Sequence, residues 1–216
     1  MGLVIAVDGP AASGKGTVGQ ALADAYALPY LDTGLLYRAV GLAVLASGGD
    51  LEDPAAAAAV AGRLTAADLD GDALRSREAG EAASRAAAHP SVRQALLDFQ
   101  RRFAADPRGA VLDGRDIGTV IAPEAPAKLF VTARPEVRAE RRWRQLTKAG
   151  EAVGLAAVLD DIARRDARDA GRGAAPMRKA DDAVLLDTSE MSISEAVDAA
   201  RRIVETARAR WDTSPG

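Results

Sequence analysis

The 216-residue chain has no cysteine, only 4% aromatic residues, and only four lysines among its 28 basic residues. Without cysteine it can form neither disulfide bonds nor thiolate metal sites. A formal net charge of −3 at pH 7 argues against a general nucleic-acid or membrane-surface binder. No apolar run is long enough to span a membrane, and Met1 and Gly2 lead directly into the first apolar segment, which leaves no room for a signal peptide. We therefore expect a cytoplasmic monomer without nucleic-acid or membrane partners.

The hydrophobic content of 48% is enough for one full core. Five short apolar segments alternate with segments of helical composition, which is the pattern of a parallel sheet covered by helices on both faces. The sequence therefore predicts an α/β fold with a five-stranded parallel sheet. The expected strands are residues 3–7, 28–31, 110–112, 128–132 and 183–186.

A glycine-rich loop follows the first expected strand. Gly9, four further residues, Gly14 and Lys15 give the spacing of a phosphate-binding loop. The glycines let the backbone curl so that its N–H groups face an anion, and the helical segment 17–26 adds its dipole. The alternative is a glycine-rich turn without a ligand. The predicted nucleotide-binding residues are Gly9, Pro10, Ala11, Ala12, Ser13, Gly14, Lys15, Gly16 and Thr17.

Polar residues follow four of the five expected strands: Asp8, Asp32 with Thr33, the run 113–116, and Asp187. In parallel sheets, ligands bind beyond the carboxyl ends of the strands, where these residues gather. Phosphoryl transfer requires positioning and charge neutralisation, so Lys15 would hold the donor phosphates. We expect Thr17 to help hold a Mg²⁺ ion that comes with ATP, and Asp113 to bind the waters of that ion.

Arginine makes up 24 of the 28 basic residues, and its planar fork suits a second, acceptor phosphate. Arg38, Arg93 and Arg115 are the strongest candidates, because each lies beside one of the polar segments. Three arginines of the segment 135–148 are interpreted instead as solvated surface charges: Arg141, Arg142 and Arg144.

A second cluster of charged residues lies between positions 165 and 172. Its members share one face if the helix beginning near residue 158 continues through them, and two glycines follow. This composition suggests a mobile lid that closes over transferring phosphates, and the alternative is a salt-bridged surface helix. The cluster consists of Arg165, Arg168, Asp169 and Arg172.

Five motifs together resemble bacterial cytidylate kinases, a family of P-loop nucleoside monophosphate kinases. In chain order they are GPAASGKGT (9–17), YLDTGLLYRA (30–39), HPSVRQALLDFQ (89–100), VLDGRDIGTV (111–120) and RDARDAGR (165–172). The resemblance runs from residue 3 to about residue 205. It implies transfer of the γ-phosphoryl group of ATP to CMP or dCMP, with UMP a poorer acceptor, in pyrimidine nucleotide metabolism.

The resemblance also implies roles for individual residues. Thr33, Arg38 and Arg115 would hold the acceptor phosphate. Ser84, Arg93 and Asp116 would read the edge of the cytosine. Asp169 and Arg165 would contact the sugar, and Arg172, with Arg165 and Arg168, would bridge the two phosphates. The catalytic set is then Lys15, Asp113, Arg165 and Arg172.

The expected organisation is a single domain of the P-loop NTPase fold with two additions. The core comprises residues 1–34, 106–148 and 174–210, interrupted by an acceptor-binding insertion at about 35–105 and a helical lid at about 149–173. The stretch 61–84 is short and lacks most of the β-rich insertion seen in many relatives. Two other functions stay open: a kinase for another nucleoside monophosphate such as UMP, and a nucleotide-binding switch.

Overall fold

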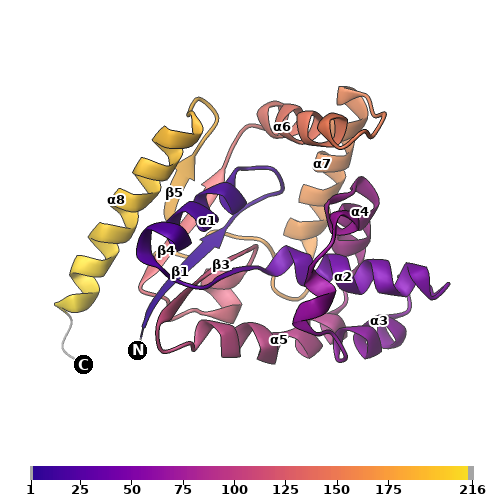
Figure 1. Cartoon of the computed structure of the whole chain (residues 1–216), viewed down its shortest axis with the longest axis horizontal. Helices are drawn as coiled ribbons and strands as arrows, with labels where there is room; N and C mark the ends of the chain where they lie inside the picture. Colours follow the sequence, from indigo (N-terminus) through magenta and orange to yellow (C-terminus); the bar gives the residue numbers. More distant parts are fainter. Residues whose placement is uncertain (1, 214–216) are drawn as a thin grey trace.

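A parallel sheet of five strands forms the centre of the computed structural model, which describes residues 2–213 (Figure 1). The strand order is β2-β3-β1-β4-β5, and every neighbouring pair is parallel. The strands are β1 (Leu3–Asp8), β2 (Tyr30–Asp32), β3 (Gly109–Gly114), β4 (Ala127–Thr132) and β5 (Val184–Asp187). The predicted α/β fold class is confirmed, and the carboxyl ends of β1, β2 and β3 lie in register.

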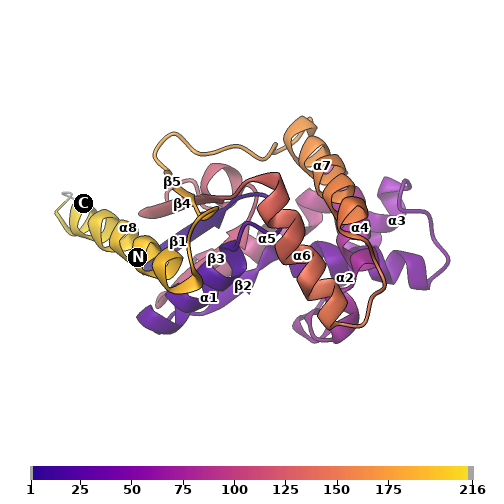
Figure 2. The ribbon, with the colours of Figure 1, turned by 90° about the horizontal axis from the view of Figure 1, so that it is seen from above.

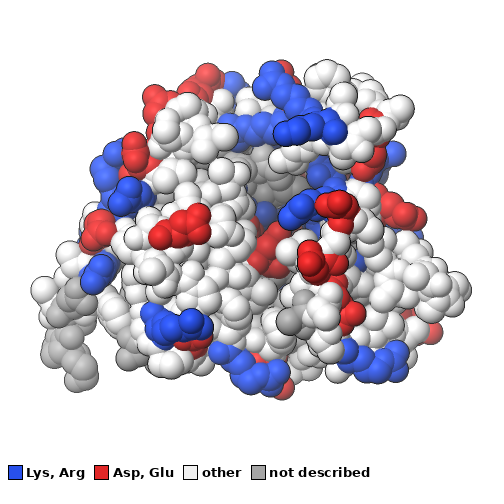
Figure 3. Space-filling model, viewed as in Figure 1, with Lys and Arg blue, Asp and Glu red and all other residues white. Residues whose placement is uncertain are grey.

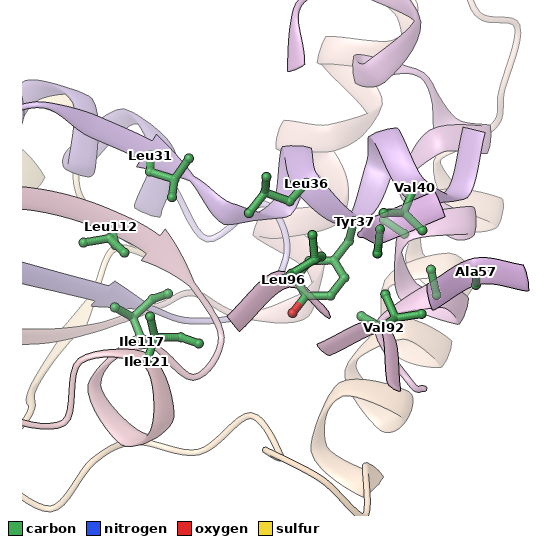
Figure 4. Packing of buried hydrophobic residues seen from close by; sticks show 14 of the residues in the cluster. Leu31, Leu36, Tyr37, Val40, Ala57, Val92, Leu96, Leu112, Ile117 and Ile121 are labelled. Atoms are coloured by element: carbon green, nitrogen blue, oxygen red, sulfur yellow. The ribbon is translucent and has the colours of Figure 1, made fainter. Parts of the chain in front are cut away.

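Alternate residues of β1 belong to different halves of the core, because successive side chains of a strand point to opposite faces of the sheet. Ile5 and Val7 pack with α1 (Lys15–Tyr26) and α8 (Ile193–Asp212). Val4 and Ala6 pack into the cluster on the other face, which Figure 4 shows continuing from the sheet into the helices. The uninterrupted apolar run of β1 is thus explained by burial on both faces.

Four helices extend the second half of the core beyond the sheet edge. They are α2 (Thr33–Ala46), α3 (Pro54–Ala61), α4 (Arg77–Ala86) and α5 (Pro90–Ala104), with single turns η1 (Ala66–Leu69) and η2 (Asp72–Arg75) between α3 and α4. On α5, Val92 and Leu96 are fully buried and Phe99 and Phe103 partly so, as their spacing indicates. Residues 61–84 contain helices and turns but no strand, which agrees with the shortened insertion.

The helices α6 (Pro135–Lys148) and α7 (Leu155–Gly171) form a hairpin that lies over the carboxyl edge of the sheet (Figures 1 and 2). A small core of Ala139, Leu146, Val158 and Ile162 joins them. The helix expected at 158–168 is longer than predicted, because α7 begins at Leu155 and ends at Gly171. Among the described residues, no helix is both long and apolar enough to cross a membrane.

The helix ends follow the local sequence signals closely. Ser192 and Glu195 form the predicted capping box at the start of α8. Pro90 and Pro135 open α5 and α6 as first-turn residues. The sequence pattern missed one element, a π-helical turn over Ile117–Ile121, because five residues are too few to show a period.

Leu129 and Leu185 offer a matched test of the core, since they lie on the adjacent strands β4 and β5 with exposed fractions of 1% and 56%. Leu129→Ala should lower the free energy of unfolding by about 2–5 kcal/mol, because it leaves a cavity in a packed core. Leu185→Ala should change it by about 0.5 kcal/mol or less. Urea denaturation measures both, and equal losses would contradict this account of the core.

Candidate active site

The glycine-rich loop between β1 and α1 has the backbone conformation of an anion-binding loop. Gly9 (φ 148°) and Gly14 (φ 93°) occupy conformations that favour glycine, and a Cβ atom at Gly9 would lie 2.0 Å from the carbonyl oxygen of Val131. Lys15 begins α1, so the unpaired N–H groups of the first helical turn face the same space as the loop. The strand–loop–helix arrangement predicted from the sequence is confirmed, although α1 begins two residues earlier than expected.

Lys15 and Asp113 form an ion pair at the carboxyl edge of the sheet. Lys15 Nζ lies 3.2 Å from Asp113 Oδ1, and the Tyr30 hydroxyl donates to Asp113 Oδ2 at 3.1 Å. Burial raises the pKa of Asp113 and lowers that of Lys15, and the attraction between the two opposes both effects. Asp113 therefore favours the charged form of Lys15 and holds its side chain at this edge of the sheet.

Asp8 connects the glycine-rich loop to the segment that follows β3. Its carboxylate accepts hydrogen bonds from the backbone N–H groups of Ile117 (2.7 Å) and Gly118 (2.8 Å) in the π-helical turn. Burial raises the pKa of Asp8 to about 7, against the effect of these two bonds. Its location at the site edge agrees with the sequence prediction, but its bonds are to the protein backbone.

A pocket of about 40 Å³ brings together most of the predicted acceptor-binding residues. Arg93 on α5 forms a buried ion pair with Asp116 and lies 5.6 Å from the ring centre of Tyr37. Ser84 Oγ, on α4, is buried there without a hydrogen-bond partner, which leaves it available to a ligand. The predicted residues that line this pocket are Thr33, Ser84, Arg93, Arg115, Asp116, Arg165, Asp169 and Arg172.

Asp169, on the predicted lid, is shared by several arginines. Arg115 Nε lies 2.9 Å from its Oδ2, Arg172 Nη2 lies 2.8 Å from its Oδ1, and Arg165 Nε lies 4.0 Å away. Burial opposes ionisation, but the guanidinium groups lower the pKa of Asp169 below its usual value. This network joins α7 to the segment after β3.

A larger cleft of about 730 Å³ extends from the glycine-rich loop along the helices that follow it. Lys15, Arg38, Arg115 and Arg165 line it together with Ala11 and Ala12 of the loop. Figure 3 shows the hollow on this face below α6, with basic side chains at its rim. The cleft thus joins the anion-binding loop to the arginines predicted for the acceptor phosphate.

Arg168, Thr17 and Asp187 were expected near the site but line neither the cleft nor the pocket. Arg168 donates two hydrogen bonds to Glu81 of α4, at 2.7 and 2.8 Å. Thr17 is exposed, whereas the position facing Asp113 is Gly16, where a Cβ atom would lie 3.2 Å from Asp113 Oδ2. Asp187 is exposed at the end of β5 and accepts hydrogen bonds from Ser189.

The interpretation of Arg141 and Arg142 as solvated surface charges is wrong. Arg141 donates to the carbonyl oxygen of Ser13 in the glycine-rich loop and to Thr188, and Arg142 lines the large cleft. Arg138 also donates to the loop, at the carbonyl oxygen of Ala11. Positions 138, 141 and 142 have the i, i+3, i+4 spacing of one helix face, a signal that the sequence contained. Arg144 is exposed as expected.

The residues at the end of β3 fit a Mg²⁺ ion that is brought in by a nucleotide. Asp113 Oδ1 is buried and has no hydrogen-bond partner, although Lys15 Nζ lies 3.2 Å from it as an ion pair. Within the described part of the chain, no cluster of three or more acidic or histidine side chains could hold a metal without other ligands. Mg²⁺ commonly binds through phosphates, waters and one or two carboxylates, and this donor set agrees with that mode.

A glycine-rich loop with its lysine and a set of arginines opposite, lining one cleft at the carboxyl edge of a parallel sheet, are typical of a P-loop phosphotransferase. The fold agrees: the crystal structure of a gluconokinase from Sinorhizobium meliloti 1021 is similar, with a TM-score of 0.52 over 99% of this chain and 98% of that one. Its sequence identity is 20%, so this similarity shows the fold alone.

Sequence comparison identifies the family. The family model for cytidylate kinase matches residues 5–206. A cytidylate kinase of Caulobacter vibrioides (strain NA1000 / CB15N) is 68% identical over 97% of this chain and 99% of its own length. That of Caulobacter sp. (strain K31) is 63% identical over the whole of both chains. The chain belongs to the cytidylate kinase family, as its five motifs suggested.

The raised pKa of Asp8 predicts a specific pH dependence of stability. An aspartate that titrates near 7 when folded and near 4 when unfolded binds its proton more tightly in the folded state, so its contribution to stability falls between about pH 4 and pH 7. Asp8→Asn removes this titration. Between pH 5 and pH 7, the free energy of unfolding of the unsubstituted protein should therefore fall relative to that of the variant. Above pH 7, the difference between the two proteins should stay constant.

Asp187→Asn is the control for this experiment. Asp187 also ends a strand, but its bonds to Ser189 lower its pKa, so it does not titrate in the same range. Urea unfolding at intervals between pH 5 and 8 measures all three proteins. A constant difference between the Asp8→Asn variant and the unsubstituted protein would contradict a titration near 7.

Proposed function

We propose that the cleft brings the phosphates of two nucleotides together, with the donor on the glycine-rich loop and the acceptor on the arginines opposite. As a cytidylate kinase, the protein transfers the γ-phosphoryl group of ATP to CMP or dCMP. The observation that carries the proposed geometry is the common cleft of Lys15, Arg38, Arg115 and Arg165. We further propose that the protein acts as a monomer in the cytoplasm, in pyrimidine nucleotide metabolism, without nucleic-acid partners.

The donor phosphates are held by the loop from Gly9 to Thr17 and by Lys15. The loop amides provide fixed N–H donors, and Lys15 neutralises charge on the phosphate that moves. When bound, Mg²⁺ would supply further neutralisation of the phosphate charge, and Asp113 would hold its waters. Thr17, predicted as a metal ligand, is on the exposed side of the first turn, so Asp113 is the better supported contact.

Three side chains are proposed to hold the phosphate of the acceptor nucleotide. Thr33, Arg38 and Arg115 bind its phosphate, which places the attacking oxygen in line with the γ-phosphate. Thr33 already donates to the backbone carbonyl oxygen of Asp113 at 2.7 Å, so its hydroxyl is positioned at the junction of the two sites. In-line positioning and charge neutralisation account for most of the rate, since phosphoryl transfer needs little covalent help.

Cytosine is read by the pair Arg93 and Asp116, together with Ser84. A fixed ion pair offers both donors and an acceptor in one orientation, and the unpartnered Ser84 hydroxyl adds a third polar contact. Such a site rejects a base with the opposite donor pattern, because its own buried groups are then left unpaired. Uracil reverses this pattern at the exocyclic group, which explains the expected poorer use of UMP.

The helix α7 completes the site as a lid over the phosphates. Asp169 and Arg165 are proposed to contact the sugar, and Arg172, with Arg165, to bridge the phosphates during transfer. The ion pairs of Asp169 with Arg115 and Arg172 support this role, because they join α7 to the segment after β3. We propose the division into a core (1–34, 106–148, 174–210), an insertion (about 35–105) and a lid (about 149–173) on these grounds. Arg168 would have to leave Glu81 to join the phosphates.

The direct test measures ADP release from ATP in the presence of CMP, dCMP, UMP, AMP or dTMP. We expect rapid turnover with CMP and dCMP, slower turnover with UMP, and little with AMP or dTMP, because only cytosine satisfies the Arg93–Asp116 pair. Equal or faster turnover with AMP would reject the assignment of the base pocket. ATP consumption unaffected by any monophosphate would indicate a nucleotide-binding switch instead.

Arg93→Ala tests the proposed base recognition. Loss of a charge-assisted hydrogen bond should weaken acceptor binding by about 1–3 kcal/mol and raise the KM for CMP accordingly, with a smaller effect on ATP. Arg102→Ala on the exposed side of the same helix is the matched control and should leave both KM values unchanged. A similar loss of affinity for both nucleotides after Arg93→Ala would count against a role in reading cytosine.

A further inference from the structure

Arg142 lies in the large cleft with Arg38 and Arg165, and none of the three has a close carboxylate partner. Arg142 Nη2 donates to the backbone carbonyl oxygens of Arg75 (3.2 Å) and Ser76 (3.1 Å), and Arg38 Nη1 donates to that of Leu74 (2.6 Å). Among the described residues, neither forms an ion pair. Arg165 reaches Asp169 only at 4.0 Å, and its Nε has no hydrogen-bond partner.

The other arginines of α6 are satisfied differently, which makes Arg142 distinct. Arg138 pairs with Asp166, Arg144 pairs with Glu140, and Arg141 donates to Thr188 and to the Ser13 carbonyl. Arg138 and Arg144 therefore have carboxylate partners, and Arg141 contacts the glycine-rich loop and Thr188, which follows β5. Among the arginines of α6, Arg142 alone lines the cleft while donating to neutral acceptors only.

The three cleft arginines are close enough to repel one another. Burial, together with the charge of Arg38, lowers the pKa of Arg142 to about 10. Burial likewise lowers the pKa of Arg165 to about 9, with Arg115, Arg38 and Arg142 contributing. Glu151 is the carboxylate that attracts Arg142, but it lies beyond ion-pair distance and accepts a bond from the Arg77 backbone. An anion placed among these groups would relieve the repulsion.

We propose that Arg142 binds the acceptor phosphate beside Arg38, exchanging the carbonyl oxygens of Arg75 and Ser76 for phosphate oxygens. This inference rests on the proposed function and adds a residue to its acceptor site. A phosphate carries the charge opposite to that of a guanidinium group and can accept two parallel hydrogen bonds from it, whereas a carbonyl oxygen is neutral, so the exchange is favourable. Arg142 and Arg38 share the same run of carbonyls, residues 74–76, which places both beside one phosphate.

The proposal also gives α6 a role in coupling the two substrates. Arg138 and Arg141 of this helix donate to the carbonyl oxygens of Ala11 and Ser13 in the glycine-rich loop. Arg142 extends from the adjacent position to the acceptor side of the cleft. One helix would therefore contact the donor loop directly and the acceptor through its phosphate.

The test compares Arg142→Gln with the unsubstituted full chain in the ADP-release assay. The two quantities are the KM for CMP and the inhibition constant of cytidine, which lacks the phosphate and competes with CMP. If Arg142 binds the phosphate, the KM for CMP rises about tenfold or more while the inhibition constant of cytidine is unchanged. Arg142→Lys keeps the positive charge and should recover part of the CMP affinity.

Arg144→Gln is the matched control, since it removes an exposed arginine from the same helix and should change neither constant. If Arg142 has only the structural role of holding the carbonyl oxygens of Arg75 and Ser76, its replacement should weaken the binding of CMP and of cytidine equally. That result, or an unchanged KM for CMP, overturns the proposal while the kinase function stands. An unsubstituted protein without CMP-dependent ADP release would instead overturn the proposed function, and this inference with it.

Discussion

The site depends on one constraint, which is that its positively charged side chains lie close together and repel one another before any substrate binds. A lysine and at least four arginines line one cleft. The protein limits the resulting repulsion with a few buried carboxylates, each of which serves a different part of the site. Asp113 pairs with Lys15, Asp116 pairs with Arg93, and Asp169 serves Arg115 and Arg172. The remaining positive charge is what two nucleotide phosphates would neutralise.

The sheet and its strand ends could be predicted from the sequence because their signals are local. The apolar run of β1, the glycines that follow it and the capping residues of α8 each determine the conformation of their own neighbourhood. Arg38, Arg93 and Arg115 could be singled out from the sequence as candidates, but their individual roles could be predicted only through the resemblance to a known family. No local signal pairs Arg93 with Asp116, because the two are 23 residues apart in the chain.

The errors have a common physical cause, which is that charged residues are assigned to the surface by default. Arg142 was interpreted as a solvated charge, yet it faces the cleft because α6 packs over the sheet edge against α7. The spacing of positions 138, 141 and 142 puts them on one face of this helix, but the sequence alone does not say that this face meets the site. The π-helical turn over Ile117–Ile121 was missed for a related reason, since its backbone N–H groups are held by Asp8, more than a hundred residues earlier in the chain.

The bond from Asp8 to the π-helical turn has a consequence for redesigning the enzyme toward other bases. A library that varies the segment after β3 to change base recognition would also vary residues 117 and 118, whose amides this carboxylate holds. A side chain at Gly118 would place its Cβ 3.1 Å from Lys128 Cδ and 3.4 Å from Asp8 Oδ2, so the Lys128 side chain or the turn would have to shift by a few tenths of an ångström. Libraries that keep Ile117 and Gly118 while varying the helical side of the pocket, at Ser84 and Arg93, would leave the donor loop undisturbed.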